Sequence, residues 1–285
     1  MPYSTIRRNE FIMRAKLQKD WIEGKGLWLL AAIYFGGVGG GLFIASVLVN
    51  WRLGLLIAVG ITAILKGSAH LMFLTHPWKF WRIFRRPQTS WVSRGIYFVF
   101  FFIIFGLAYY FMGGVPLQVL SVFFAFCLVI YTGFVLLASR PISFWNNPLL
   151  PILFVSVSIA SGISLAEIIH TFSPQDIGNP ELLKAAGPWG VSITALLLFV
   201  YLAGNFYSSV TAKESLTYLL KGPLALLFYG GVVFLGLLLP LVIFILVHFA
   251  MVPSSALAIA GISELIGAFI LRYSILKVGM SAPVA

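Results

Sequence analysis

Long apolar runs dominate the chain, and polar residues are confined to short stretches between them. A bilayer core of about 30 Å is crossed by a helix of about 20 residues, so a run of this length is a candidate membrane span. The candidate runs cover residues 27–49, 53–74, 95–139, 148–170, 188–209 and 222–276.

Two of these runs are too long for a single span, and each contains a helix-breaking sequence. Gly-Gly-Val-Pro at 113–116 interrupts the first, and Met-Val-Pro at 251–253 interrupts the second. Glycine and proline in such clusters mark turns. The pattern therefore predicts an all-α integral membrane protein with eight transmembrane helices and both termini on one side.

We expect the eight helices to form two four-helix bundles, preceded by a polar tail over residues 1–26. Residues 27–140 carry the first four helices, and residues 141–285 carry the other four. Within the tail, residues 9–21 place apolar side chains roughly on one side, as in an amphipathic helix on the membrane surface. An ordered polar tail without a helix is the alternative.

The composition excludes a soluble domain and a disordered protein. Of the 285 residues, 60% are hydrophobic and 9% are charged, and the mean hydropathy is +1.01. Soluble domains carry about 25% charged residues, and disorder requires low hydrophobicity. The single cysteine, Cys127, excludes a disulfide framework and a cysteine-ligated iron–sulfur cluster or zinc site in this chain.

Basic residues are distributed unevenly between the two sides of the membrane. The net charge is +11, from 19 basic and 8 acidic residues. Arg52 and Lys184 fall on the side opposite the termini, and Lys66 falls within a helix. The other sixteen fall on the terminal side: Arg7, Arg8, Arg14, Lys16, Lys19, Lys25, Lys79, Arg82, Arg85, Arg86, Arg94, Arg140, Lys213, Lys221, Arg272 and Lys277. This asymmetry predicts a multi-pass protein of the cell (inner) membrane with both termini in the cytoplasm, and it indicates topology, not nucleic-acid binding.

Lys66 and His70 lie four residues apart inside the second apolar run, so a helix places them on the same face. A charged group within the bilayer is costly and is a functional candidate by default. The pair could bind a ligand or relay protons. It could also be a hydrogen-bonded pair that only joins two helices.

Three further ionisable residues are candidates for a proton relay together with Lys66. Glu167 and His170 fall near the far end of the fifth helix, and Glu264 falls well inside the eighth. An interfacial position for the first two, and a structural hydrogen bond for Glu264, are the alternatives.

The sequence offers no metal site and no catalytic motif. Haem held by two histidines requires both at matching depth on facing helices, and the sequence has four scattered histidines, His70, His76, His170 and His248. We find no phosphate-binding loop and no catalytic triad. We therefore expect no haem, no metal and no catalytic residue in this chain.

Glycine is concentrated in the first helix, where five of the six residues at 36–41 are glycine. Small residues allow membrane helices to approach each other closely. The run therefore predicts a crossing of the first helix with a neighbour, and it also leaves space for a planar ring or a lipid tail.

Three motifs, taken in order, resemble the NrfD/PsrC family of membrane subunits of polysulfide reductase and related respiratory complexes. The resemblance covers about residues 26–165. Its motifs are Tyr-Phe-Gly-Gly at 34–37; His-Pro-Trp-Lys-Phe-Trp-Arg at 76–82, continuing through Arg-Pro at 86–87 to Thr-Ser-Trp-Val-Ser-Arg-Gly at 89–95; and Tyr-Thr-Gly-Phe at 131–134 with Trp-Asn-Asn-Pro-Leu-Leu-Pro at 145–151.

This resemblance implies a haem-free bundle that anchors a four-cluster, ferredoxin-like iron–sulfur subunit. That subunit carries electrons to or from a catalytic molybdopterin subunit. The membrane subunit binds a quinone, often menaquinone, near the face where the iron–sulfur subunit docks. The implied function is electron exchange between a quinol and the iron–sulfur partner, with no catalysis by the isolated membrane subunit.

The resemblance and the polar residues together predict a quinone pocket among the first four helices. A tyrosine that matches Tyr131 belongs to the family's pocket, and the family commonly has an acidic residue or histidine where this sequence has Phe73. Lys79, Arg82, Arg85 and Arg86 form a basic loop suited to docking an acidic partner surface. The predicted pocket residues are Tyr34, Lys66, His70, His76 and Tyr131.

Two other classes of function remain open from the residues alone. A proton-coupled membrane transporter would explain Lys66, Glu167 and Glu264, although no inverted repeat is evident. A cytochrome subunit with haem b is the other alternative.

Overall fold

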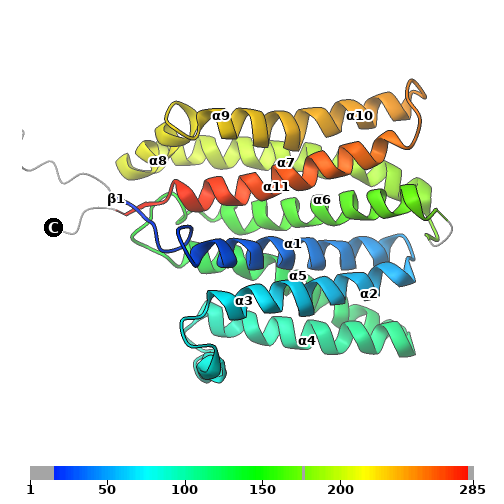
Figure 1. Ribbon diagram of the computed structural model, residues 1–285, viewed down its shortest axis with the longest axis horizontal. Coiled ribbons are helices and arrows are strands. Elements are labelled where there is room, and N and C mark those ends of the chain that lie inside the picture. Colours follow the sequence, from blue (N-terminus) through cyan, green and yellow to red (C-terminus); the bar gives the residue numbers. More distant parts are fainter. Residues whose placement is uncertain (1–15, 175–176, 282–285) are drawn as a thin grey trace, which may run out of the picture.

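Eight helices long enough to cross a membrane lie side by side in the computed structural model, which describes residues 16–174 and 177–281 (Figure 1). Six spans are continuous helices: α1 (Gly26–Leu48), α4 (Trp91–Met112), α5 (Val115–Leu137), α6 (Leu149–Phe172), α7 (Pro180–Ser208) and α11 (Ala256–Lys277). This arrangement confirms the predicted all-α membrane fold.

The other two spans each contain a π-helical segment. The second span consists of α2 (Arg52–Gly60), a π-helix over Ile61–Lys66 and α3 (Gly67–Phe73). The seventh consists of α9 (Ala225–Leu227), a π-helix over Phe228–Leu238 and α10 (Leu239–His248). A π-helical turn shifts the side chains that follow it round the helix axis, and such turns are frequent at functional sites.

The two ends of the bundle differ in structure. The terminal end carries a 3₁₀ helix (Pro77–Arg85), α8 (Val210–Leu220) and an antiparallel pair of short strands, β1 (Lys16–Leu17) and β2 (Met280–Ser281). The far end carries the short turns between consecutive spans (Figure 1). The predicted tail helix over residues 9–21 lies mostly outside the described residues. In its described part, residues 16–21, Lys16 and Leu17 form strand β1 and the rest is not helical, so the helix prediction is wrong there.

The sixth span begins earlier than the sequence predicts. We expected it at residues 188–209, whereas α7 starts at Pro180 and contains Pro188 in its interior. The side chain of Asn179 accepts a hydrogen bond from the backbone N–H of Leu182 at 3.0 Å. An asparagine cap followed by proline at the first position is a strong helix start, and it outweighs the breaking tendency of the later proline.

Helix α1 runs through the middle of the bundle and makes its most extensive contacts with α6. A Cβ atom built on Gly41 would overlap the backbone at Ser158, and one on Gly162 would overlap the backbone at Gly41. The two helix backbones are therefore in direct contact at this crossing, as the glycine run predicts.

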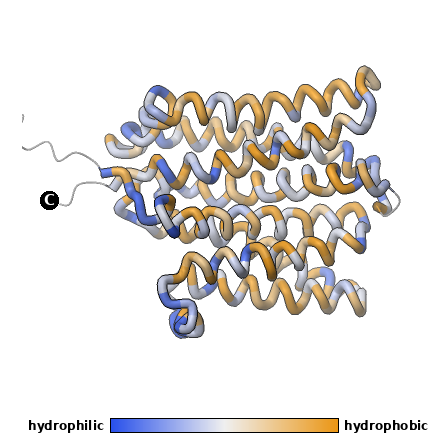
Figure 2. Tube along the Cα trace, in the orientation of Figure 1, coloured by the Kyte–Doolittle hydropathy of each residue, from blue (hydrophilic) through white to orange (hydrophobic). Residues whose placement is uncertain are grey.

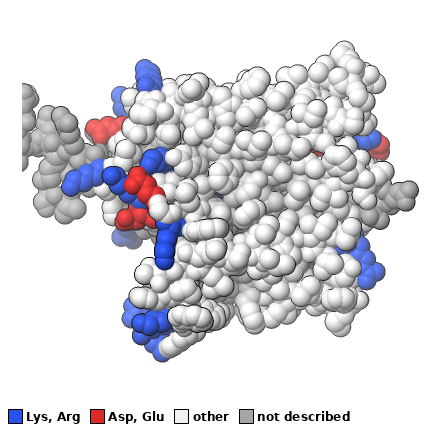
Figure 3. Space-filling model, viewed as in Figure 1, with Lys and Arg blue, Asp and Glu red and all other residues white. Residues whose placement is uncertain are grey.

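The outer surface is apolar along the helices and charged at both ends. Figure 2 shows hydrophobic residues along the length of every span, with hydrophilic residues concentrated at the ends. Large side chains such as Phe111, Leu226 and Phe199 are 70%, 87% and 71% exposed. In Figure 3, Lys and Arg are gathered mainly at the terminal end of the visible face. The pattern is that of a protein whose sides contact lipid.

The segment before α1 is held against the end of α11. Glu23 and Lys277 form an ion pair at 3.0 Å, and the ammonium group of Lys277 lowers the pKa of the Glu23 carboxyl. The backbone N–H of Gln18 donates to the oxygen of Gly279 at 2.8 Å. These contacts join the two ends of the described residues at the same end of the bundle.

Candidate functional site

Lys66 is buried inside the bundle at the end of the first π-helical segment, with 2% of its surface exposed. Its ammonium nitrogen Nζ donates to the backbone oxygen of Ala32 at 3.2 Å and to the hydroxyl of Tyr131 at 2.9 Å. Gly36 provides the space, because a Cβ atom there would lie 2.7 Å from Nζ. Lys66 thus connects its own span to α1 and α5.

Tyr131 completes this pair from α5 and is 7% exposed. A Cβ atom on Gly95 would overlap the Tyr131 ring, so the absence of a side chain there lets α4 pack against the tyrosine. The Tyr131 hydroxyl oxygen accepts from Lys66. Within residues 16–174 and 177–281, no acceptor is found for the hydroxyl hydrogen, which leaves it available to a ligand.

Lys66 has no carboxylate partner in the described part of the protein. The two ion pairs found there join Lys184 to Glu181 and Lys277 to Glu23. An ammonium group carries three N–H donors, and two of these are used by protein oxygens. A buried cation without a counter-ion is costly within the bilayer, so a ligand with a carbonyl or phenolate oxygen at the third N–H would stabilise this one.

His70 lies one turn from Lys66 toward the terminal end and is half-buried. Its ring nitrogen Nδ1 is 3.3 Å from the backbone oxygen of Lys66. A carbonyl oxygen can only accept, so this contact requires the hydrogen on Nδ1 and leaves Nε2 free to bind a proton. Leu65, Leu71 and Met72, around Lys66 and His70 in the same span, are 41%, 47% and 53% exposed, so this part of the span borders the lipid.

Tyr34 does not join Lys66, contrary to our prediction of a shared pocket. Its hydroxyl donates to the backbone oxygen of Leu265 on α11 at 3.2 Å, and its ring packs edge-on against Phe269. Successive helix residues are rotated by about 100°. Tyr34 is two residues from both Ala32 and Gly36, the two α1 positions that face Lys66, so it lies on the opposite side of α1. There it lines an apolar groove of about 300 Å³ against α11.

His76 and the predicted docking residues lie outside the bundle at the terminal end. His76 is exposed directly before the 3₁₀ helix, which contains Lys79, Arg82 and Arg85 and has no buried residue. Trp78 within it is 90% exposed. The guanidinium of Arg85 stacks over the Trp81 ring at 4.4 Å. No contact between His76 and the Lys66–Tyr131 pair is found in the described residues.

The predicted relay residues are divided between the two sides of α1. Glu264 on α11 is 3% exposed, and its Oε1 lies 3.2 Å from the Ser161 hydroxyl oxygen. Glu167 on α6 is 1% exposed, and neither of its oxygens has a partner in the described residues. His170 is one turn further toward the far end. Lys66 lies on the other side of α1 and does not belong to this group.

Arg272 is a buried residue that our sequence reasoning missed. We assigned it to the basic terminal surface, but it is 1% exposed. It donates to the hydroxyl of Ser158 and to the backbone oxygen of Ala268, both at 3.1 Å. A Cβ atom on Gly37 would lie 2.6 Å from its Nη2. Its spacing of eight residues from Glu264, about two helical turns, is the signal that could have identified it.

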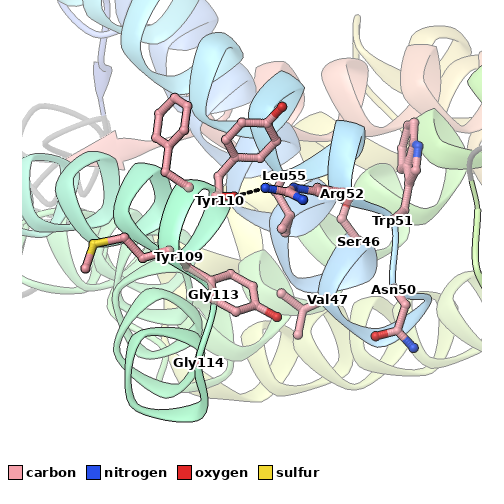
Figure 4. A pocket seen from close by; sticks show the side chains of 12 residues that line it. Ser46, Val47, Asn50, Trp51, Arg52, Leu55, Tyr109, Tyr110, Gly113 and Gly114 are labelled. Atoms are coloured by element: carbon pink, nitrogen blue, oxygen red, sulfur yellow. Dashed lines mark hydrogen bonds between the residues drawn. The ribbon is translucent and has the colours of Figure 1, made fainter.

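A separate polar pocket of about 430 Å³ opens at the far end of the bundle, between the turn before α2 and the turn after α4 (Figure 4). Arg52 lines it and donates to the backbone oxygen of Tyr110 at 3.0 Å. Tyr109 and Asn50 also line it. No residue of the Lys66–Tyr131 pair lines this pocket, so it is not part of that site.

The spans and the buried polar residues define a multi-pass α-helical membrane protein with a cation–phenol pair inside its bundle. The sequence model of the family described as "Polysulphide reductase, NrfD" matches residues 26–284. The protein belongs to this family, and the match extends well beyond the 26–165 segment on which the resemblance was based.

Three curated relatives support the family assignment. The sequence is 27% identical to "Protein NrfD homolog" of Haemophilus influenzae over 267 residues, covering 81% of this protein and 83% of the relative. It is 30% identical to "Protein NrfD" of Escherichia coli over 261 residues, covering 78% and 80%. It is 32% identical to the C component of polysulfide reductase of Wolinella succinogenes over 171 residues, covering 58% and 54%.

Proposed function

We propose that this protein is the membrane anchor and quinone-reactive subunit of a respiratory oxidoreductase complex. It exchanges electrons between a quinol, with menaquinol as the expected substrate, and a partner iron–sulfur subunit. The observation that carries the proposal is the buried Lys66–Tyr131 pair, which has free hydrogen-bond donors and, in the described residues, no carboxylate partner.

The donor set of this pair fits a quinone oxygen. Lys66 has one unused N–H, and Tyr131 has its hydroxyl hydrogen, so two donors can meet one carbonyl oxygen. The apolar, lipid-bordering residues of the second span suit the rest of a lipid-soluble molecule. Few polar groups within an apolar surrounding are typical of small-molecule sites.

The protein's own groups can also move the protons that the reaction requires. Interconversion of quinone and quinol transfers two electrons and two protons. Lys66 or Tyr131 can give or take one of these protons at the ligand oxygen that the pair holds, and His70 Nε2 can take one on the side toward the terminal end. Along the second span, His70 follows Lys66 by one helical turn.

The depth of the pair favours electron exchange at the terminal end. Lys66 lies seven residues from the end of α3 and Tyr131 six residues from the end of α5, which is roughly 10 Å in each case. The sequence has no metal-binding motif of its own, so the electrons require a one-electron carrier on a partner. The exposed basic segment with Lys79, Arg82, Arg85 and Arg86 begins a few residues after α3, and we assign it the docking of that partner.

The wider assembly is inferred from the family. The name of the Wolinella relative presents it as one component of polysulfide reductase, and we extend this to a complex with an iron–sulfur subunit and a catalytic molybdopterin subunit. We place the complex in the cell inner membrane, with both termini and the docking segment in the cytoplasm. The basic residues at the terminal end support this orientation.

Replacing Tyr131 with phenylalanine should weaken binding of a short-tailed menaquinone analogue by about tenfold. The change removes one donor at the ligand and leaves the ring against Gly95, and a hydrogen bond to a polar or charged group is worth roughly 1–3 kcal/mol. Calorimetric titration of the full-length protein in lipid nanodiscs measures this. Tyr109→Phe, at the far-end pocket, is the matched control. Unchanged affinity in Tyr131→Phe, or an equal loss in Tyr109→Phe, would refute the placement.

The orientation can be tested by cysteine labelling in a Cys127→Ala background. We expect a membrane-impermeant maleimide to label Ser173→Cys, at the far end, from outside intact cells. Lys79→Cys, in the docking segment, should react only after the membrane is permeabilised. Labelling of both positions from the same side would contradict the topology, and the reverse pattern would overturn the cytoplasmic assignment.

A further inference from the structure

A row of polar side chains winds around α6 on the side of α1 away from Lys66. Its members are Ser158, Ser161, Ser164, Glu167 and His170. Each step of three residues keeps neighbours about 5–6 Å apart and rotates the row by about 60° around the helix. The row extends about 18 Å, from the middle of the bundle to the far end.

Most of this row is buried. Ser158, Ser161, Ser164 and Glu167 are 2%, 0%, 1% and 1% exposed. Glu167 and Phe244 meet beside α7, because a Cβ atom on Gly187 would lie 2.5 Å from Oε1 of Glu167 and 2.8 Å from the Phe244 ring. His170, the last member, is partly exposed at the far end. The row is therefore closed along most of its length and open at one end.

The two carboxyl groups along the row lack the partners that a carboxylate requires. Neither oxygen of Glu167 has a hydrogen-bond partner among the described residues, and Oε2 of Glu264 has none either. A buried, unpaired carboxylate in a bilayer is strongly destabilised relative to its protonated form. The geometry thus favours a proton on at least one of the two groups.

The contacts of Ser161 also favour a protonated carboxyl group. Its single hydroxyl hydrogen lies within reach of the backbone oxygen of Val157, at 2.7 Å, and of Oε1 of Glu264, at 3.2 Å. When the hydrogen is donated to Val157, the second contact is a hydrogen bond only if Glu264 carries the proton and donates to Ser161.

The inner end of the row is closed by a fixed positive charge. Arg272 donates to the Ser158 hydroxyl, and a Cβ atom on Gly37 would touch both groups. Among the described residues, Tyr34 on α1 lies near Glu264 and Arg272, and at the far end Lys184 lies near His170. A buried guanidinium repels a proton and acts as a barrier to its further movement.

We propose that Glu167 and Glu264 form a proton-holding site connected to the far side of the membrane through His170, and that Arg272 ends this half-channel in the middle of the bundle. The site goes beyond the quinone proposal and does not require it. If both hold, Gly36 faces the quinone pair and Gly37 faces the end of the half-channel, so one helix, α1, separates the two.

Infrared spectroscopy of the full-length protein in lipid vesicles tests the proton-holding site without any quinone. The carbonyl stretch of a protonated carboxyl group is distinct from the bands of a carboxylate. At neutral pH we expect such a band in the unmodified protein, weakened by Glu167→Gln or by Glu264→Gln. Glu214→Gln, at an exposed position on α8, is the matched control and should leave the band unchanged.

Transfer of the vesicles to D₂O tests the connection to the far side. The band should shift as deuterium replaces the proton, and His170→Leu should slow this exchange by about tenfold or more. The site would be overturned if the unmodified protein shows no protonated carboxyl band, a result that does not depend on whether a variant folds. It would also be overturned if neither glutamine variant weakens the band. Exchange at an unchanged rate in His170→Leu would overturn the route. A negative result here leaves the Tyr131 binding test unaffected, so the two proposals fail separately.

Discussion

Lys66→Met should lower quinol-linked turnover of the complex by about a hundredfold or more. Methionine has a similar length and is apolar, so it fills the space beside Gly36 without a charge. Loss of a preorganised donor at a reacting oxygen typically lowers the rate by roughly a hundred- to a thousandfold. Because Lys66 has no carboxylate partner in the described residues, the substitution leaves no opposite charge unpaired, and the fold should persist.

Two measurements separate this effect from a general defect. Reduction of the catalytic partner by an artificial dye bypasses the membrane subunit, so dye-linked activity should be unchanged in Lys66→Met. Lys221→Met, at an exposed position of the terminal end, should keep full turnover with quinol and with dye. Full quinol turnover in Lys66→Met, or equal loss of both activities, would contradict the assigned role.

The number and the depth of the helices could be predicted from the sequence because the bilayer constrains both. A span must contain about 20 apolar residues, so the ends of each run fix how deep every residue lies. The family resemblance assigned Tyr131 to the pocket, and its depth agreed with that assignment before the structure placed the polar atoms of Lys66 and Tyr131 2.9 Å apart.

The direction in which each residue faces could not be predicted in the same way. The spans are apolar around most of their circumference, so periodicity gives little information about which side meets a neighbouring helix. Tyr34, which lies in the first motif of the family resemblance, was therefore assigned to the Lys66 pocket, although the structure turns it toward α11. The π-helical turn before Lys66 adds a rotation that the sequence does not reveal.

Arg272 shows the limit of assigning charges to a membrane surface by position alone. It lies five residues from the end of α11, a depth from which a long basic residue can reach the interface. It remains inside because Ser158 offers a hydroxyl and Gly37 offers space on the facing helices. These are contacts between distant parts of the sequence, and no local pattern reports them.

The glycines of α1 account for the position of both buried cations. Gly36 makes room for Lys66, Gly37 makes room for Arg272, and Gly41 allows α1 to touch α6. Because α1 has no side chains at these positions, a buried cation from a neighbouring helix fits against each of its two sides. The spacing between the helices, more than the polar residues themselves, determines whether the two sites exist.

Gly41→Val should destabilise the protein by about 3 kcal/mol or more, and the unfolding temperature should fall by about 6–12 °C. The added carbons would overlap the backbone at Ser158, which has no rotamer to escape into, so α1 and α6 must separate. For a protein of this size, each 1 kcal/mol corresponds to roughly 2–4 °C. Thermal unfolding of the full-length protein in detergent, followed by circular dichroism, measures the change.

Gly60→Val is the matched control, because a Cβ atom there meets nothing within 4 Å. Glycine and valine differ by less than about 1 kcal/mol in helix propensity, so this variant should unfold within a few degrees of the unmodified protein. Separation of α1 from α6 would also move Gly36 and Gly37 away from Lys66 and Arg272. The affinity for the menaquinone analogue should therefore fall in Gly41→Val even below the unfolding temperature of this variant. Equal stability of the two valine variants would contradict the prediction, because it would show that the α1–α6 crossing is looser than its backbone contacts indicate.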